Sequence, residues 1–322
     1  MSSWQSILNP LPTEALPLAV PALALMPLTE LGLVRLRGEE SEKFLQGQIT
    51  ADLTQLAPNQ ATLAAQCDPK GKMLGLFTLL RHQGDVLLIE ARDAIATQLP
   101  GMAKFAVFNK VALTDASDEL LLLGLAGNEA EKALNAAGLE TPKDALHVIS
   151  NDHGLVLKTA DNRFIVALSP DAMATLVNTL NGSWYQAAAW QGLDVVSATP
   201  WLPAALQGEY IPQQLNIDTL GGISFEKGCY IGQEVVARMH FRGGNKKTLW
   251  QLGGKAATTP KAGDEIELKL GENYRRGGIV VAAYQFAEGQ LRLLAVANND
   301  LEPDSQFRVK DQPDSSLSLI SG

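Results

Sequence analysis

The sequence predicts an α+β protein whose C-terminal part is built only from strands. Up to about residue 240, helix-like and strand-like segments alternate in short units, which favours sheets with helices packed on one face. Residues 62–67 and 73–81 form the clearest pair of strands, because the Asp-Pro-Lys-Gly sequence between them suits a tight turn. After Gly243-Gly244 the chain carries short strand candidates separated by Gly, Pro and Asp. We therefore expect a small barrel or sandwich from about residue 246.

Local patterns predict the elements of the first third of the chain. Residues 33–37 are expected to form a strand and residues 39–46 a short helix, because acidic residues occupy its first turn and Gly47 follows its end. A further strand is expected at residues 86–91. It is followed by a helix at residues 93–104, which Asp93 is suited to cap.

The following elements are predicted in the same way. The continuous apolar run at residues 120–125 fits a buried strand, and residues 128–137 then fit a helix. After a strand at residues 163–168, Ser169 can cap a helix whose first residue is Pro170. Apolar residues recur in this helix at helical spacing, at Met173, Leu176, Val177 and Leu180. The later strands are expected at residues 247–252, 264–270, 278–285 and 290–296.

The N-terminal segment and the cysteines indicate the cellular compartment of the protein. Residues 15–28 are uncharged and apolar, but they contain three prolines and are shorter than the roughly 20 residues of a membrane span. A signal peptide would need a positively charged start, but no Lys or Arg precedes Arg35. We expect an irregular, extended segment lying on the fold and no membrane contact. Two cysteines, Cys67 and Cys229, do not make a disulfide framework, so a cytoplasmic protein is expected.

Charge limits the possible partners. A formal net charge of −9 argues against a protein that wraps nucleic acid tightly, since such proteins carry a basic surface. One basic cluster is either a solvated surface or a contact for an anionic partner. It consists of Arg238, Arg242, Lys246 and Lys247. The four histidines show no metal-ligand spacing with either cysteine, so no metal site is expected.

One octapeptide carries the most chemical information. It consists of Lys227, Gly228, Cys229, Tyr230, Ile231, Gly232, Gln233 and Glu234. The thiol of Cys229 stands near a lysine and ahead of a helix expected to begin at Gln233, and both a cation and a helix N-terminus favour the reactive thiolate. The glycines leave room for another molecule to approach. Cys229 is therefore a candidate reactive residue, with a small buried cysteine at a tight turn as the alternative.

This octapeptide resembles the signature of the YgfZ family, whose mitochondrial relatives assist iron–sulfur assembly. Further segments that resemble the family lie on both sides of it, in the right order. They are Gly38, residues 44–48, 50–52, 67–72, 210–213, 220–225, 236–238, 241–243, 298–300 and 302–304. The resemblance thus covers nearly the whole chain.

The resemblance implies a fold like that of the glycine-cleavage aminomethyltransferase, with domains arranged in a ring. Two intertwined subdomains would occupy residues 1–245 and a small β-barrel residues 246–322. Tetrahydrofolate or a derivative would lie in a central channel, with Trp190 at an aromatic position beside the pterin, where an indole can stack. Cys229 would do thiol chemistry with Lys227 holding its anion. The partners would be iron–sulfur enzymes of tRNA modification, with direct tRNA contact as a weaker possibility.

Several positions depart from the related aminomethyltransferases. Leu31 stands where some relatives have a second tryptophan beside the folate, and it cannot stack in the same way. Val196 stands where they have a glutamate that binds the pterin, and a valine cannot accept a hydrogen bond; Asp194 could compensate from a different angle. Residues 89–93 lack the asparagines that precede the catalytic aspartate, and Asp93 fits a helix cap better.

Three functions follow from these observations. The first is a cytoplasmic folate-binding accessory protein that supports tRNA methylthiolation and iron–sulfur enzymes through Cys229, without being a classical enzyme. The second is a folate-dependent aminomethyl transferase, against which the sequence at residues 89–93 counts. The third is a non-catalytic interaction module that keeps only the fold, in line with the departures at Leu31 and Val196.

Overall fold

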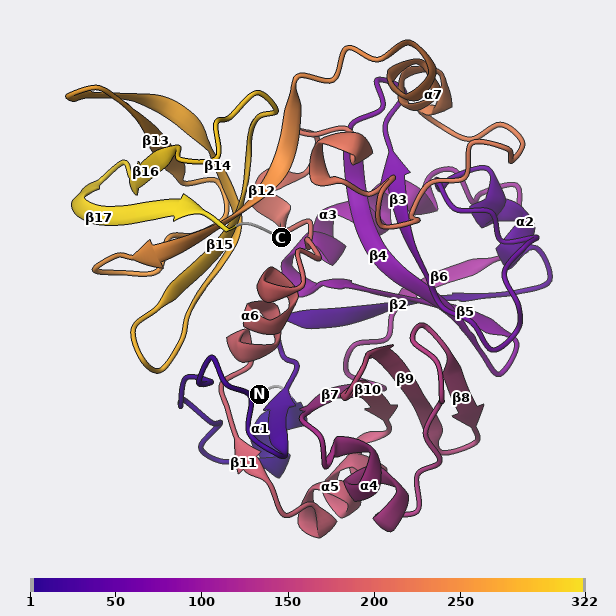
Figure 1. Cartoon of the computed structure of the whole chain (residues 1–322). Helices are drawn as coiled ribbons and strands as arrows, with labels where there is room; N and C mark the ends of the chain where they lie inside the picture. Colours follow the sequence, from indigo (N-terminus) through magenta and orange to yellow (C-terminus); the bar gives the residue numbers. More distant parts are fainter. Residues whose placement is uncertain (1–2, 321–322) are drawn as a thin grey trace.

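The computed structural model describes residues 3–320, which form two open β-sheets and a closed β-barrel (Figure 1). We call them sheet A, sheet B and the barrel. The three lie around a common centre, where helix α6 (Ala188–Val196) separates the barrel from the sheets. The predicted α+β class and the C-terminal barrel are confirmed.

Sheet A contains six strands from distant parts of the chain. In spatial order they are β11 (Ser183–Trp184), β1 (Ala24–Pro27), β7 (Leu121–Ala126), β10 (Arg163–Leu168), β9 (Gly154–Ala160) and β8 (Val148–Asn151). The strand β1 thus pairs with β7, which follows it by about 100 residues, and with β11, which follows it by about 160 residues. The expectation of an irregular, extended segment at residues 15–28 is corrected at residues 24–27, which form β1 because their hydrogen-bonding partners are remote in sequence.

The strands of sheet B lie between β1 and β7 in the sequence. Their order in the sheet is β3 (Thr62–Cys67), β4 (Met73–His82), β5 (Asp85–Ala91), β2 (Leu31–Arg37) and β6 (Ala112–Asp115). The predicted hairpin of β3 and β4 is confirmed. The side chain of Asp68 accepts hydrogen bonds from the backbone N–H groups of Lys70 and Lys72, and Gly71 takes the positive φ of 74° that the turn requires.

The barrel closes with six antiparallel strands. In order they are β12 (Lys247–Lys255), β15 (Leu291–Asn298), β14 (Asn273–Gln285), β13 (Glu265–Leu270), β16 (Gln306–Val309) and β17 (Gln312–Leu319). The first four correspond to predicted strands. The last two were not predicted, because β17 is rich in Ser, Asp and Pro and is a strand only through its neighbours in the closed barrel. The division into domains over 1–245 and 246–322 stays a prediction.

Besides α6 the helices are α1 (Ser3–Ile7), α2 (Ser41–Gln46), α3 (Arg92–Ala103), α4 (Ala130–Ala136), α5 (Pro170–Thr179), α7 (Gln233–Arg242) and the 3₁₀ turns Ala204–Leu206 and Pro212–Leu215. Helices α2, α3, α4 and α5 pack against strands of the two sheets. Within the described residues, no helix combines the length and apolarity needed to cross a membrane.

Two predicted helix caps had different outcomes. The Ser169 hydroxyl accepts the N–H of Ala172 at 3.4 Å, so its cap on α5 is confirmed. Asp93 does not cap α3, which begins one residue earlier with Ala91 at the cap position. The Arg92 N–H donates to the carbonyl of Glu30 at 2.9 Å, and this tertiary contact accompanies the earlier start of the helix.

The helix α6 connects all three β-structures. Its Gly192 lies against the ring of Tyr284 on β14, where any larger residue would overlap the ring. The Tyr284 hydroxyl in turn accepts the backbone N–H of Leu16 at 2.7 Å. On its other side α6 contributes Trp190 to a core shared by both sheets. This packing brings α6 to the edge of a cavity.

Candidate functional site

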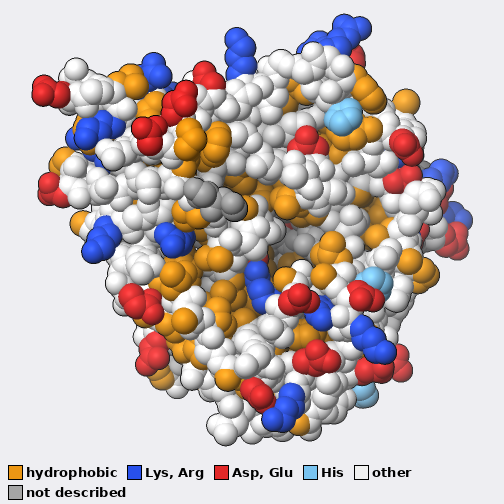
Figure 2. Space-filling model, in the orientation of Figure 1, with side chains coloured by type: hydrophobic (Ala, Val, Ile, Leu, Met, Phe, Trp, Pro, Cys, Tyr) orange, Lys and Arg blue, Asp and Glu red, His pale blue; other side chains and the backbone are white. Residues whose placement is uncertain are grey.

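A cavity of about 300 Å³ lies between sheets A and B, beside α6. This volume is at the lower end of the range for small-molecule sites. Figure 2 shows that the molecule is hollowed near the middle of one face, with hydrophobic side chains around the hollow. Most of the wall is apolar and comes from Leu31, Leu63, Leu76, Ile89, Ile165 and Leu220. Such a cavity suits a flat, mostly apolar group.

Leu31 and Trp190, the two residues predicted to contact folate, both line this cavity. Trp190 is only 2 % exposed, and its edge packs against Gly124 of β7. The guanidinium of Arg163 lies over the indole, 4.5 Å from the ring centroid. The cation therefore already takes one position over the ring, so Trp190 serves as a rigid wall. Its stacking on a ligand stays a prediction.

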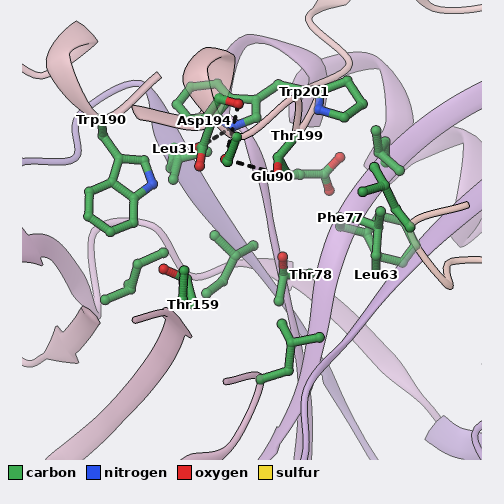
Figure 3. A pocket seen from close by; sticks show the side chains of 18 of the residues that line it. Leu31, Leu63, Phe77, Thr78, Glu90, Thr159, Trp190, Asp194, Thr199 and Trp201 are labelled. Atoms are coloured by element: carbon green, nitrogen blue, oxygen red, sulfur yellow. Dashed lines mark hydrogen bonds between the residues drawn. The ribbon is translucent and has the colours of Figure 1, made fainter. Parts of the chain in front are cut away.

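One wall of the cavity is polar (Figure 3). Asp194 of α6 accepts hydrogen bonds from Nη2 of Arg163 at 2.7 Å and from Nε1 of Trp201 at 2.8 Å. Burial raises the pKa of the Asp194 carboxyl, while the ion pair with Arg163 and the bond from Trp201 act in the opposite direction. Trp201 was not predicted from the sequence. Its only local signal is that it follows the acid Asp194 by seven residues and carries an indole N–H that can donate to it. Val196 is 46 % exposed and is not among the lining residues.

A second buried acid, Glu90 of β5, borders the same cavity. Its neighbours across the sheet are Gly32 and Phe77, and strand alternation puts its side chain on the face opposite to that of Ile89. Figure 3 shows its carboxyl group on the side of Phe77. Neither carboxyl oxygen has a hydrogen-bond partner among the described residues. Burial, with a smaller effect of Asp115, raises the pKa of Glu90 to about 8, so it is largely protonated at neutral pH.

The predicted reactive segment lies elsewhere. Cys229 is exposed in the loop before α7, whereas Cys67 is buried in β3. The helix α7 begins at Gln233 as predicted. None of the residues 227–234 lines the cavity. Cys229 is therefore not among the residues that line the cavity, whereas Leu31 and Trp190 are.

Lys227 contacts main-chain carbonyls, and its expected role in holding the anion of Cys229 stays a prediction. Its side chain is buried, and Nζ donates hydrogen bonds to the carbonyls of Ile49 at 2.8 Å and Ala51 at 2.6 Å. Burial lowers the pKa of Lys227 to about 8, while the negative charge of Asp52 acts in the opposite direction. A buried ammonium group with two carbonyl partners fastens the signature loop to the segment that follows α2.

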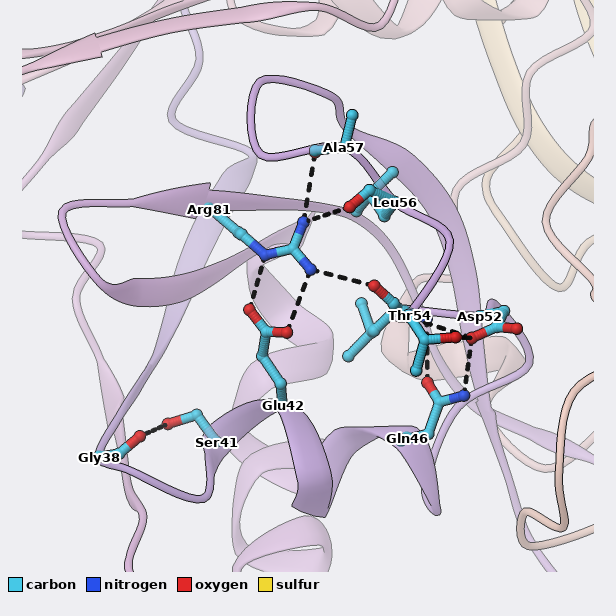
Figure 4. A network of polar contacts seen from close by, with 10 residues as sticks. Gly38, Ser41, Glu42, Gln46, Asp52, Thr54, Leu56, Ala57 and Arg81 are labelled. Atoms are coloured by element: carbon cyan, nitrogen blue, oxygen red, sulfur yellow. Dashed lines mark hydrogen bonds and ion pairs between the residues drawn. The ribbon is translucent and has the colours of Figure 1, made fainter.

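That segment is itself held by a polar network (Figure 4). Arg81 pairs with Glu42 and donates to the carbonyls of Leu53, Leu56 and Ala57. Asp52 accepts hydrogen bonds from Gln46 at 2.8 Å and from the Thr54 hydroxyl at 2.7 Å. The segment that binds Lys227 is therefore also held by hydrogen bonds that do not involve the lysine.

Glycines let the signature loop approach the β3–β4 hairpin. Gly232 has a φ of 86°, and a side chain there would meet the Asp68 carbonyl and the Cβ of Cys67. A side chain at Gly71 would meet Val235 of α7. Both glycines are thus required by backbone conformation and by close approach. This contact brings together two distant parts of the chain, residues 67–72 and 227–234.

We predict that Lys227→Met will lower the free energy of unfolding by about 1–3 kcal/mol, because it leaves two carbonyls without their partner. Lys72→Met is the matched control. Lys72 donates to one carbonyl, that of Glu209, from an exposed position, so its loss should cost within about 0.5 kcal/mol. Urea denaturation of the three proteins makes the comparison. Equal stability of wild type and Lys227→Met would show that the lysine is not structural.

The basic cluster lies beside the signature, and its four side chains are exposed. No ion pair with an acid is found for Arg238, Arg242, Lys246 or Lys247 within residues 3–320. Phe225 stacks on His240 at 3.7 Å, and Phe241 is 72 % exposed. Across the described chain no group of His, Cys, Asp and Glu could hold a metal ion.

Comparison with solved structures defines the class of protein. The glycine cleavage system aminomethyltransferase T of Bartonella henselae superposes with a TM-score of 0.75, covering 96% of this chain and 86% of that one at 16% sequence identity. The model of the GCVT N-terminal domain matches residues 19–160, and that of the YgfZ β-barrel domain matches residues 245–312. The chain has the aminomethyltransferase-like fold.

The chain belongs to the YgfZ family. The tRNA-modifying protein YgfZ of Klebsiella pneumoniae (strain 342) is 44% identical over 293 residues, which are 90% of this chain and 89% of the relative. The protein of the same name from Escherichia fergusonii is 43% identical over 293 residues, 90% of each chain. The family predicted from the octapeptide is thus confirmed.

Proposed function

We propose that the protein is a cytoplasmic, folate-binding accessory factor that supports tRNA modification and iron–sulfur enzymes, with Cys229 as its reactive thiol. The cavity between the two sheets is the observation that carries this proposal. It combines apolar walls with the polar wall around Asp194, and a flat pterin needs both. The family and its tRNA-modifying relatives support the proposed role.

The chain's own residues would hold the folate in distinct ways. Leu31, Ile89 and Ile165 would enclose the apolar faces of the pterin, and the polar wall would meet its hydrogen-bonding edge. Trp190 would close one side of the cavity. Tetrahydrofolate, when bound, would supply a carrier for one-carbon units. That none of the residues 227–234 lines the cavity agrees with separate roles for the ligand and the thiol.

Tetrahydrofolate should bind the protein in solution, as measured by calorimetric titration. Thr78→Trp should abolish binding, because Thr78 lines the cavity and an indole there would fill it. Thr114→Trp, on the exposed edge strand of the same sheet, is the matched control and should bind as wild type does. Binding that survives Thr78→Trp would place the folate elsewhere. Turnover to methylene-tetrahydrofolate would instead support aminomethyl transfer.

Cys229 should be the cysteine that reacts with iodoacetamide. Cys67 is buried, and burial raises the pKa of its thiol to about 12, so only about one thiol in ten thousand is ionised at pH 8. We expect Cys67→Ser to leave the labelling rate of the native protein unchanged and Cys229→Ser to remove it. Complementation of tRNA methylthiolation then tests function, for which Cys229→Ser should fail. Full complementation would leave Cys229 as an ordinary loop residue.

The proposed partners are iron–sulfur enzymes of tRNA modification. The exposed cations at Arg238, Arg242, Lys246 and Lys247, which have no acidic partner among the described residues, lie beside the signature and would suit an anionic partner there. Such a contact would bring that partner close to Cys229.

A further inference from the structure

The polar wall of the cavity is a connected cluster of three side chains from different elements. Arg163 comes from the first residue of β10, Asp194 from α6 and Trp201 from the loop that follows it. All three line the cavity, in which most of the remaining wall is apolar (Figure 3). A buried carboxylate in an apolar wall is costly unless it is paired, so the cluster calls for an explanation.

The cluster keeps unused hydrogen-bonding capacity. A carboxylate has about four acceptor sites, and Asp194 uses one on each oxygen, for Arg163 and for Trp201. The Nε of Arg163 is buried and has no partner within the described residues. The opposite charges of Arg163 and Asp194 compensate each other. The free acceptor sites of Asp194 therefore suit N–H donors and the Arg163 Nε–H suits an acceptor, and the compensated charge favours a neutral ligand over an ion.

The cluster is also held in place before any ligand binds. The guanidinium of Arg163 is fixed between Asp194 and the indole of Trp190. The helix that carries Asp194 is fixed by the contact of Gly192 with Tyr284. A fixed acceptor loses little entropy on binding and discriminates sharply between a donor and an acceptor placed opposite it.

We propose that Asp194 is the specificity-determining anchor of the cavity and accepts the N–H groups of a 2-amino-4-oxopyrimidine edge. This proposal rests on the proposed function, because the pterin of tetrahydrofolate carries that edge. The ring N–H and the 2-amino group point in parallel, as the donors of a guanidinium do, and match a carboxylate. An oxygen in place of the 2-amino group would face the carboxylate with another acceptor, so such a ligand is rejected.

The test compares tetrahydrofolate with its deaminated analogue, in which oxygen replaces the 2-amino group, by calorimetric titration. Wild type should bind tetrahydrofolate about 10- to 100-fold more tightly than the analogue, the ratio expected for a hydrogen bond to a charged group. Asp194→Asn should lose this preference, because its amide can donate to the new oxygen. Asp171→Asn, an exposed acid on α5, is the matched control and should keep the preference.

Each outcome decides between the two proposals. An unchanged preference in a folded Asp194→Asn protein would overturn the anchor while leaving folate binding intact. If Asp194→Asn does not unfold cooperatively, Asp194→Glu replaces it in the test. That change displaces the carboxylate and must reduce the preference for tetrahydrofolate over its analogue. Failure of wild type to bind tetrahydrofolate would overturn the proposed function. The smaller pair of 6-methyl-tetrahydropterin and the matching tetrahydrolumazine then tests the anchor alone, and equal binding or no binding of the two would overturn it.

Discussion

Replacing Trp190 by alanine should lower the free energy of unfolding by about 3–5 kcal/mol, the usual cost of removing a large aromatic side chain from a core. Trp190 is fully enclosed, with Gly124 at its edge and Arg163 over its ring. The indole belongs to the core that joins sheets A and B. Its loss therefore weakens the contact between the sheets as well as leaving a void.

The measurement is urea denaturation followed by circular dichroism. Trp190→Phe keeps most of the buried area and should cost less than half as much. Trp250→Ala serves as a matched control, because Trp250 is only partly buried on the barrel and its removal should cost less than that of Trp190. A loss below about 1 kcal/mol for Trp190→Ala would contradict the packing described here.

This result changes how folate contact by Trp190 must be tested. From the stacking chemistry, Trp190→Ala is expected to weaken tetrahydrofolate binding by about 1–3 kcal/mol. Because the same change disrupts the core, Trp190→Phe is the sharper variant. It keeps an aromatic ring in the wall, so it should retain most of the binding that the alanine variant loses. Equal affinity of all three proteins would remove Trp190 from the folate site.

Glu90 should make the protein less stable as the pH rises from about 4.5 to 8. Burial raises the pKa of Glu90 from 4.5 to about 8. Between these values the folded protein retains a proton that the unfolded chain has lost, so stability falls with rising pH. A tenfold change in a protonation equilibrium is worth about 1.4 kcal/mol, so the full loss approaches about 4–5 kcal/mol.

The comparison with Glu90→Gln isolates this carboxyl. The glutamine side chain has nearly the same shape and does not ionise, while every other titrating group is shared by the two proteins. We expect the two proteins to differ little at pH 5, and the variant to be more stable by several kcal/mol at pH 8. Denaturation midpoints at pH 5, 6.5 and 8 provide the measurement. Parallel curves for the two proteins would mean that Glu90 is already ionised, or already paired, in the folded state.

Elements defined by their own residues could be predicted from the sequence. The β3–β4 hairpin depends on Asp68 and Gly71 within the turn, and the start of α5 depends on Ser169. Elements defined by remote partners could not. The strand β1 exists because β7 and β11 lie on either side of it, and β17 exists because the barrel closes. Backbone pairing supplies hydrogen bonds that the local sequence does not signal.

The candidate site divides in the same way. The octapeptide predicted an exposed Cys229 and the start of α7 at Gln233. The family resemblance predicted that Leu31 and Trp190 belong to one site, and both line the cavity. The partners of Lys227 could not be predicted, because Ile49 and Ala51 contribute carbonyls, which every residue possesses. Strand β5 did contain one usable signal, the charged residue Glu90 directly after the apolar run at residues 86–89.

By itself, then, the sequence determined the family, the fold class and the two regions of chemical interest, because short-range patterns and a specific motif carry that information. Only the tertiary structure decided that no residue of the octapeptide lines the cavity, that Lys227 fastens a loop, and that Arg163, Asp194 and Trp201 form one polar wall. Those three residues span 39 positions of the chain and come from a strand, a helix and a loop. The physical reason is that their hydrogen bonds and burial arise only when sheet A and α6 close around the same cavity, a long-range event that no local pattern encodes.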